Sequence, residues 1–176
     1  YRWNGRTWAL EMLLEATTPR GMWGASPDAL WAVDDGLGVR RWDGAGWQRV
    51  PASTVHPLRA IWGSSATDIW DVGGGGAVQR WDGTRWEAQP VPTGADLLAV
   101  TGTGDTDVWV GGHTALLHWD GAEWTPVPIP TTRFLLDLWA APLIAGRLVA
   151  PQPVDETVRP QVLQRPHDRI ARPAEP

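Results

Sequence analysis

Tryptophan recurs in this chain at a fixed interval, within a short motif that occurs four times. The motif opens with Trp followed by Asn or Asp and then Gly, and it closes with a second Trp. Its copies are Trp3–Trp8, Trp42–Trp47, Trp81–Trp86 and Trp119–Trp124, and their first Trp positions are 39, 39 and 38 residues apart. A repeat of this length is typical of a propeller or a solenoid, in which each unit stacks on its neighbours.

Two further series of residues repeat in the same phase. One consists of Trp23, Trp62, Thr101 and Trp139, and the other of Trp31, Trp70 and Trp109. The segments around them are short, rich in Val, Ile and Trp, and bounded by Gly, Asp, Ser and Pro, which are strand signals. Four short strands in each unit predict a four-stranded antiparallel meander, the blade of an all-β propeller.

The turns and the prolines fit this interpretation. The Asn-Gly or Asp-Gly pair in each motif predicts a tight turn, because Gly adopts a positive φ at little cost. The two Trp of one motif then face each other across a hairpin made by the third and fourth strands. Pro follows the last Trp of a unit at Pro51, Pro90, Pro126 and Pro128. Since Pro lacks an N–H group, these positions suit an outer edge strand.

Counting units divides the chain into a half blade at 1–18, complete blades at 19–56, 57–93 and 94–132, and a partial blade at 133–150. The two terminal parts pair in a four-bladed ring, and a fragment of a larger ring is the alternative. The chain begins in mid-repeat, so we expect a fragment or a processed piece. Residues 151–176 are rich in Pro and Arg and contain no Trp. We expect a disordered tail there, because little apolar surface is available to offset chain entropy.

Composition narrows the range of functions. The net charge of −5 argues against nucleic acid as a partner, since nucleic-acid binding requires a basic surface. The chain has no Cys, which excludes a disulfide framework and thiol chemistry. No apolar run approaches the ~18 residues that a membrane span needs, and no signal peptide is recognisable.

The second unit carries the most complete pattern, in Trp62-Gly63-Ser64-Ser65, Asp68-Ile69-Trp70-Asp71-Val72-Gly73 and Arg80-Trp81-Asp82-Gly83-Thr84-Arg85-Trp86. This pattern resembles the Trp-rich β-propeller repeats of secreted bacterial proteins, over about residues 1–140. It is more distantly similar to tectonin repeats, whose lectins bind sugars. It departs from WD40 repeats and from the sialidase Asp-box. The resemblance implies a propeller fold and a location in the cell envelope or outside the cell, and it implies no activity.

The second Trp of each complete unit's hairpin is the candidate ligand site, namely Trp47, Trp86 and Trp124. These three lie nearest the outer edge of their blades, and an exposed Trp offers a flat apolar face for stacking on a sugar ring. The competing interpretation is that Trp at matching positions packs neighbouring blades together, and the sequence favours packing for any single Trp. Exposure of the three in a cleft would indicate a sugar site, and burial would indicate a scaffold.

A basic residue precedes the first Trp of every motif, at Arg2, Arg41, Arg80 and His118. These residues form either a basic circle, one per blade, or local ion pairs. If Trp70 lies opposite Val78 in its hairpin, Asp68 lies opposite Arg80 and Asp107 opposite His118. Local ion pairs are therefore the favoured interpretation, each contributing only ~0.2–1 kcal/mol.

No other residues indicate catalysis or metal binding. Asp34-Asp35 and the pair Asp105 and Asp107 offer few oxygens, whereas Ca²⁺ requires about six to eight. The four His have no metal-ligand spacing, and no nucleophile motif is present. We therefore predict no catalytic residue, no metal and no cofactor. The expected function is a non-catalytic binding or interaction module with a protein or glycan partner. A lectin-like sugar binder is the alternative, and an enzyme whose site is built from distant loops is the third possibility.

Overall fold

The structure is a computed structural model of the chain, and it describes residues 2–3, 6–9, 18–36, 38–129 and 134–140. The chain divides into two compact units, Tyr1–Pro142 and Leu143–Pro176, and every described residue belongs to the first. The predicted tail at 151–176 lies outside the described residues. Within them, no helix is long and apolar enough to cross a membrane.

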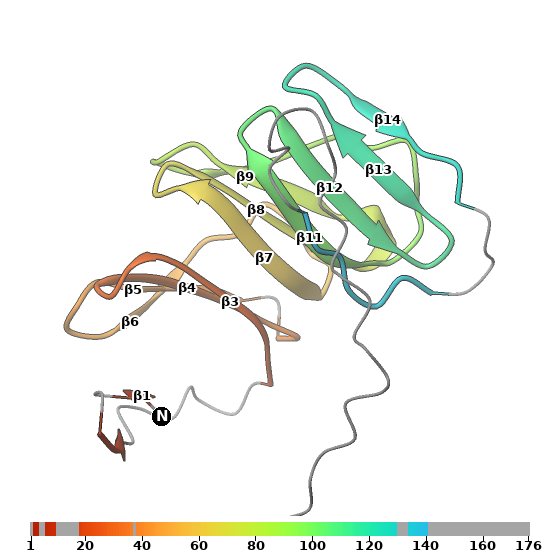
Figure 1. The fold of residues 1–176 in the computed structure, drawn as a ribbon. Helices are drawn as coiled ribbons and strands as arrows, with labels where there is room; N and C mark the ends of the chain where they lie inside the picture. The colour runs from red at the N-terminus through yellow and green to blue at the C-terminus, as the bar shows by residue number, and fades with distance from the viewer. Residues whose placement is uncertain (1, 4–5, 10–17, 37, 130–133, 141–176) are drawn as a thin grey trace, which may run out of the picture. The chain divides into compact units, whose positions relative to one another are not determined.

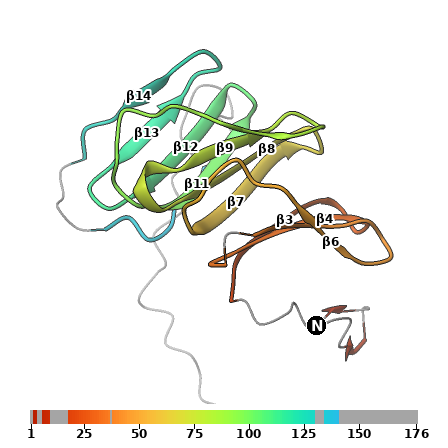
Figure 2. The ribbon, with the colours of Figure 1, turned by 180° about the vertical axis from the view of Figure 1, so that it is seen from behind.

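Three four-stranded antiparallel sheets follow one another along the chain (Figure 1), and the reverse view shows the same succession (Figure 2). Blade 1 contains β3 (Pro19–Ser26), β4 (Ala29–Asp34), β5 (Val39–Trp42) and β6 (Trp47–Val50). Blade 2 contains β7 (Leu58–Ser65), β8 (Asp68–Gly73), β9 (Val78–Trp81) and β10 (Trp86–Ala88), with a 3-10 turn η1 (Gly74–Gly76) after β8. Blade 3 contains β11 (Leu97–Gly104), β12 (Asp107–Gly112), β13 (Leu116–Trp119) and β14 (Trp124–Pro126). In each blade the strands pair in chain order, which confirms the predicted all-β meander.

Ahead of these blades, β1 (Arg2–Trp3) and β2 (Trp8–Ala9) form a two-stranded antiparallel hairpin. Trp3 pairs with Trp8 across this hairpin. The same pairing occurs in all three complete blades, where the two Trp of each motif are directly opposite. The motif therefore builds the hairpin of the third and fourth strands, as the sequence predicts.

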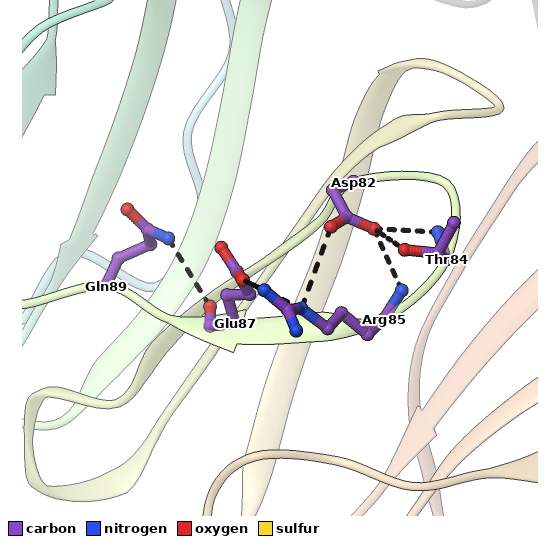
Figure 3. A network of polar contacts seen from close by, with 5 residues as sticks. All are labelled: Asp82, Thr84, Arg85, Glu87 and Gln89. Atoms are coloured by element: carbon purple, nitrogen blue, oxygen red, sulfur yellow. Dashed lines mark hydrogen bonds and ion pairs between the residues drawn. The ribbon is translucent and has the colours of Figure 1, made fainter.

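The Asp and the Gly of the motif in each complete blade stabilise this hairpin turn in different ways, the Asp by accepting hydrogen bonds and the Gly by adopting a positive φ. In blade 2, one carboxylate oxygen of Asp82 accepts hydrogen bonds from the backbone N–H groups of Thr84 and Arg85, at 2.7 and 2.9 Å (Figure 3). Gly83 adopts a φ of +99°, which L side chains rarely adopt. Asp43 and Asp120 accept the corresponding pairs of N–H bonds in the other blades. The hydroxyl of Thr84 also donates to Asp82. This bond first, and then the two backbone bonds, stabilise the charged carboxylate and lower the pKa of Asp82 to about 2.

The register predicted for the middle hairpins of blades 2 and 3 was wrong. Trp70 lies opposite Arg80 in blade 2, and Trp109, not Asp107, lies opposite His118 in blade 3. The equivalent register occurs in blade 1, where Trp31 lies opposite Arg41, although η1 in blade 2 is the only 3-10 turn among the described residues. The register therefore goes with the repeat: the connection between the second and third strands takes up residues that the prediction had placed in the strands, such as Ala77 in blade 2. The shift is by an even number of residues, so the side chains keep their faces.

Both predicted pairs of side chains nevertheless come into hydrogen-bonding contact, reaching diagonally across the strands. Arg80 Nε lies 2.6 Å from a carboxylate oxygen of Asp68, and the guanidinium also lies over the Trp70 ring, 4.9 Å from its centre. In blade 3, His118 Nε2 lies 2.8 Å from Asp107. Hence Arg80 and His118, two of the four predicted basic positions, each contact an Asp of their own blade.

Tryptophans pack the blades against each other. Trp31 of β4 is buried against Trp81 and Trp86 of blade 2, with ring centres 4.9 and 5.7 Å away. Trp70 of β8 repeats this contact one blade later, 5.5 Å from Trp119 and 5.4 Å from Trp124. Two apolar cores result, one at each blade-to-blade contact. Trp31 and Trp70 thus each insert against the Trp hairpin of the next blade, whereas Trp109, in the same series, stacks on His118 of its own blade.

Candidate functional site

A surface groove of about 450 Å³ lies where blade 2 leads into blade 3. One wall is the segment Gln89–Pro92, which follows β10, and the other is the hairpin of β13 and β14. The principal side chains on the hairpin wall are Trp119, Glu123 and Trp124. The groove is therefore formed by an aromatic wall facing a Pro-Val-Pro segment.

Both walls are held firmly by the blades. The indole N–H of Trp119 donates to the backbone carbonyl of Asp105 at 3.2 Å, and one side of its ring packs on Trp70. On the opposite wall, the N–H of Gln89 bonds to the carbonyl of Val78 at 2.8 Å, and Val91 packs against the core beneath. Pro90 and Pro92 restrict the backbone between these anchors. Trp119 is only half-buried, so part of its ring faces the groove.

The groove has few polar groups. Glu123 is exposed at the hairpin turn and carries a carboxylate. Gln89 offers a side-chain amide, whose nitrogen lies 3.5 Å from the carbonyl of Glu87 (Figure 3). An aromatic face with one amide and one carboxylate suits recognition by stacking and a small number of hydrogen bonds. It provides no paired acid and base for a reaction.

The structure places the three predicted site residues in three different blades. Trp47 is half-buried on β6 beside Trp42, with ring centres 5.9 Å apart. Trp86 is buried edge-on against Trp31. Trp124 is 8% exposed and packs edge-on against Trp70, while its remaining surface lines the groove. The three do not form one site, and sugar binding by any of them stays a prediction.

Sequence reasoning missed Trp119 as the more open aromatic residue of the groove. Its counterparts in the other blades, Trp42 and Trp81, are each 6% exposed. The Pro-Val-Pro segment that forms the opposite wall was not a specific signal, because it occurs both at Pro90–Pro92 and at Pro126–Pro128.

The acidic pairs serve turns and ion pairs. Asp34 accepts the N–H groups of Gly36 and Gly38, while Asp35 pairs with Arg20 at 2.9 Å. Asp107 is partly buried, which raises its pKa, but hydrogen bonds from Thr103, His118 and Trp109 outweigh this and lower it overall. Within the described ranges, no group of three His, Asp or Glu side chains could hold a metal ion.

A buried polar cluster joins blade 2 to the segment that precedes it. Gln79 donates to Asp71 at 2.9 Å, and its oxygen accepts the hydroxyl of Ser53 at 2.6 Å. Asp71 and Gln79 are fully buried, and burial raises the pKa of Asp71 to about 8. Asp71 is therefore largely neutral at pH 7. Blade 3 has Val110 and Leu117 at these positions, so the cluster is peculiar to blade 2.

No protein-family model and no curated protein sequence matches this chain. Several solved structures are similar to it in fold. YCF48 from Cyanidioschyzon merolae superposes with a TM-score of 0.56 at 17% identity, over 65% of this chain and 41% of that one. The WD40 β-propeller domain of Doa1 gives a TM-score of 0.58 at 8% identity, over 68% and 43%.

Two further similar structures contain a bound molecule. YCF48 bound to D1 peptide gives a TM-score of 0.57 at 16% identity, over 76% of this chain and 48% of that one. A catalytically inactive H270A virginiamycin B lyase from Staphylococcus aureus, with quinupristin, gives 0.56 at 18% identity, over 64% and 42%. The chain thus spans less than half the length of these propellers. At such identities the likeness shows the fold, and the fold of this chain is a β-propeller.

Proposed function

We propose that this chain is a non-catalytic interaction module that holds an extended segment of a partner protein in the groove of Trp119. The observation that carries this proposal is the half-buried Trp119 ring facing Pro90–Pro92. Aromatic residues positioned by a rigid scaffold are typical anchors of protein interfaces, because they bury a large area at little entropic cost.

The chemistry of the groove defines the segment that it would accept. The aromatic face and the prolines favour an apolar or proline-containing stretch, and Glu123 favours a neighbouring Lys or Arg. A similar propeller, YCF48, has been solved with a bound peptide, which supports a peptide as the ligand class. From the resemblance of its repeats, we further propose that the protein acts in the cell envelope or outside the cell.

Selection of peptides from a random library on the immobilised chain tests the proposal. We expect selected peptides to bind with micromolar Kd by calorimetry, and Trp119→Ala to weaken binding at least tenfold. Val55→Ala is the matched control, because Val55 is an exposed apolar residue that lines a separate groove. Equal binding by wild type and Trp119→Ala would refute the groove as the site, provided that both melt at similar temperatures.

A carbohydrate is the second candidate ligand, since a Trp face beside an amide and a carboxylate also suits a sugar ring. A glycan array distinguishes the two. Glycan binding that depends on Trp119, without any selected peptide, would replace the peptide proposal. Glycan binding lost in Trp47→Ala but kept in Trp119→Ala would instead place a sugar site on blade 1.

A further inference from the structure

The first strands of neighbouring blades interlock through a Trp and a Gly. A Cβ atom on Gly63 of β7 would lie 2.9 Å from the ring of Trp23 on β3, so the ring lies directly on the glycine. The contact repeats one blade later, where Trp62 lies 2.7 Å from the Cβ position of Gly102 on β11. Each Trp therefore needs a residue without a side chain in the blade that follows.

An apolar residue two positions before each of these glycines completes the contact. Ile61 and Val100 occupy this position, and they are only 7% and 9% exposed. Each belongs to a core shared with the preceding blade. A blade thus offers its predecessor a small apolar recess, made of one aliphatic side chain and one glycine.

Blade 1 carries the same recess, and in this structure the recess is open. Met22 and Gly24 stand at the positions of Ile61 and Gly63, as the pairing of their strands with β4 and β8 shows. Met22 is 59% exposed, and Gly24 is exposed as well. The atoms nearest to a Cβ on Gly24 all belong to blade 1 itself, chiefly Leu30.

The complementary Trp is open at the other end of the blades. Residues 134–140 follow blade 3, where the N–H of Leu135 bonds to the carbonyl of Gly112 at 3.1 Å. Leu135 and Leu138 lie 3.1 Å from the Cβ position of Gly111, so this segment packs on blade 3. Trp139 stands in the repeat where Trp23 and Trp62 stand, and it is 72% exposed.

A paired exchange of residues supports this alignment of residues 134–140. Blade 3 has Thr101 at the position of Trp23 and Trp62, and Ala140 stands where the other blades have Gly63 and Gly102. Thr101 is smaller than the Trp that it replaces, and Ala140 is larger than the Gly that it replaces, so the two changes compensate each other. This is what the contact requires if residues 134–140 act as the first strand of a following blade.

We propose that Trp139 of one copy of this chain docks on Met22 and Gly24 of a second copy, head to tail. Donor and acceptor are then the two halves of the contact that already joins blade 1 to blade 2 and blade 2 to blade 3. Both halves of this contact are exposed on the described residues of one chain, so a second copy of the chain is a complementary partner at either end. A head-to-tail contact ends in a ring when its rotation closes.

Size-exclusion chromatography with light scattering tests the docking on the 176-residue chain. We expect the wild type to elute at twice its mass of 19.3 kDa at tens of micromolar. Trp139→Ala removes the donor, Met22→Arg puts a charge into the acceptor, and both should elute as monomers with unchanged circular dichroism. Leu136→Ala is the matched control, because Leu136 is equally exposed in the same segment but stands outside the contact.

Mixing the two variants adds a sharper test. Trp139→Ala retains its acceptor and Met22→Arg retains its donor, so a mixture has one intact contact per pair and should associate measurably more than either variant alone. A monomeric wild type, or a dimer that persists in Trp139→Ala, would overturn the proposal. Failure of the mixture to associate would overturn its head-to-tail form and indicate a face-to-face contact.

Discussion

Trp31 of blade 1 lies edge-on against Trp86 of blade 2, with ring centres 5.7 Å apart and ring planes at 85°. The pair Trp70 and Trp124 repeats this arrangement at the next blade contact, at 5.4 Å and 87°. Edge-on aromatic pairs are worth about 0.5–1.5 kcal/mol beyond the area that they bury. Trp31, Trp70, Trp86 and Trp124 are therefore explained by packing between blades. Trp119 contributes to this packing through Trp70 and also leaves part of its ring open to the groove.

Trp70 should be essential for stability. Its side chain is fully buried between the Trp hairpin of blade 3 and the guanidinium of Arg80. Removal of a buried aromatic side chain typically costs about 3–5 kcal/mol. We expect Trp70→Ala to lower the free energy of unfolding by that amount, measured by urea denaturation. Trp47→Ala, at a half-buried position, serves as the comparison, and a similar small loss in both variants would contradict the core role of Trp70.

Asp71 should make stability depend on pH in an unusual direction. Burial raises the pKa of Asp71 from 3.8 to about 8, so the folded chain keeps a proton that the unfolded chain has already released. Stability from this group is complete below about pH 4 and is lost as the pH rises to about 8. One pKa unit corresponds to about 1.4 kcal/mol, so the loss is on the order of 5 kcal/mol.

Asp71→Asn tests this effect, because Asn keeps an oxygen for the bond from Gln79 but cannot ionise. We expect the variant to gain stability relative to wild type as the pH rises from 4 to 8, in denaturation curves at each pH. Asp43→Asn is the control, since hydrogen bonds from Ala45 and Gly46 lower the pKa of Asp43 and remove it from this window. A constant difference between Asp71→Asn and wild type would show that Asp71 is charged when folded.

Asp82 should act in the opposite direction, at lower pH. Its pKa is lowered to about 2, so its contribution is present above about pH 4 and disappears as the pH falls to about 2. Asp82→Asn retains an oxygen acceptor for the turn but has no charge to lose. We expect wild type to melt at a higher temperature than Asp82→Asn at pH 6, and the gap to narrow by pH 2. A gap that stays unchanged at pH 2 would contradict this assignment.

The sequence predicted those features that depend on neighbouring residues along the chain. The strands of each blade and the Asp-Gly turns follow from local patterns, because a tight turn requires Gly83 and an Asp82 acceptor whatever surrounds them. The pairing of Trp81 with Trp86 follows from that turn. The same is true of the ion pair between Asp68 and Arg80, whose long side chain reaches its partner despite the shifted register.

The remaining features depend on how one blade lies on the next, and a single repeat does not encode this. The register of β8 and β9 depends on how many residues the connection between them takes up, and the sequence presents that connection only as a run of glycines. Asp71 is buried beside Gln79, whose oxygen accepts the hydroxyl of Ser53 from the segment before blade 2, so its surroundings include residues far away in the chain. Trp119 is half-buried although Trp70 packs on it as Trp31 packs on its buried counterpart Trp81, so the repeat pattern alone does not predict the exposure of Trp119.

Gly83 provides the last test. Comparing it with a second glycine shows whether the positive φ of the turn, and not glycine in general, is what stability requires. Its φ of +99° is strained for any L side chain, and a Cβ would lie 2.9 Å from the methyl group of Thr67. Strained backbone of this kind costs about 1–3 kcal/mol. We expect Gly83→Ala to lower the free energy of unfolding within that range. Gly104→Ala is the control, since no heavy atom lies within 4 Å of its Cβ position. Equal effects of the two substitutions in urea denaturation would mean that the Asp-Gly turn tolerates a side chain, and that the hydrogen bonds to Asp82 alone maintain the hairpin.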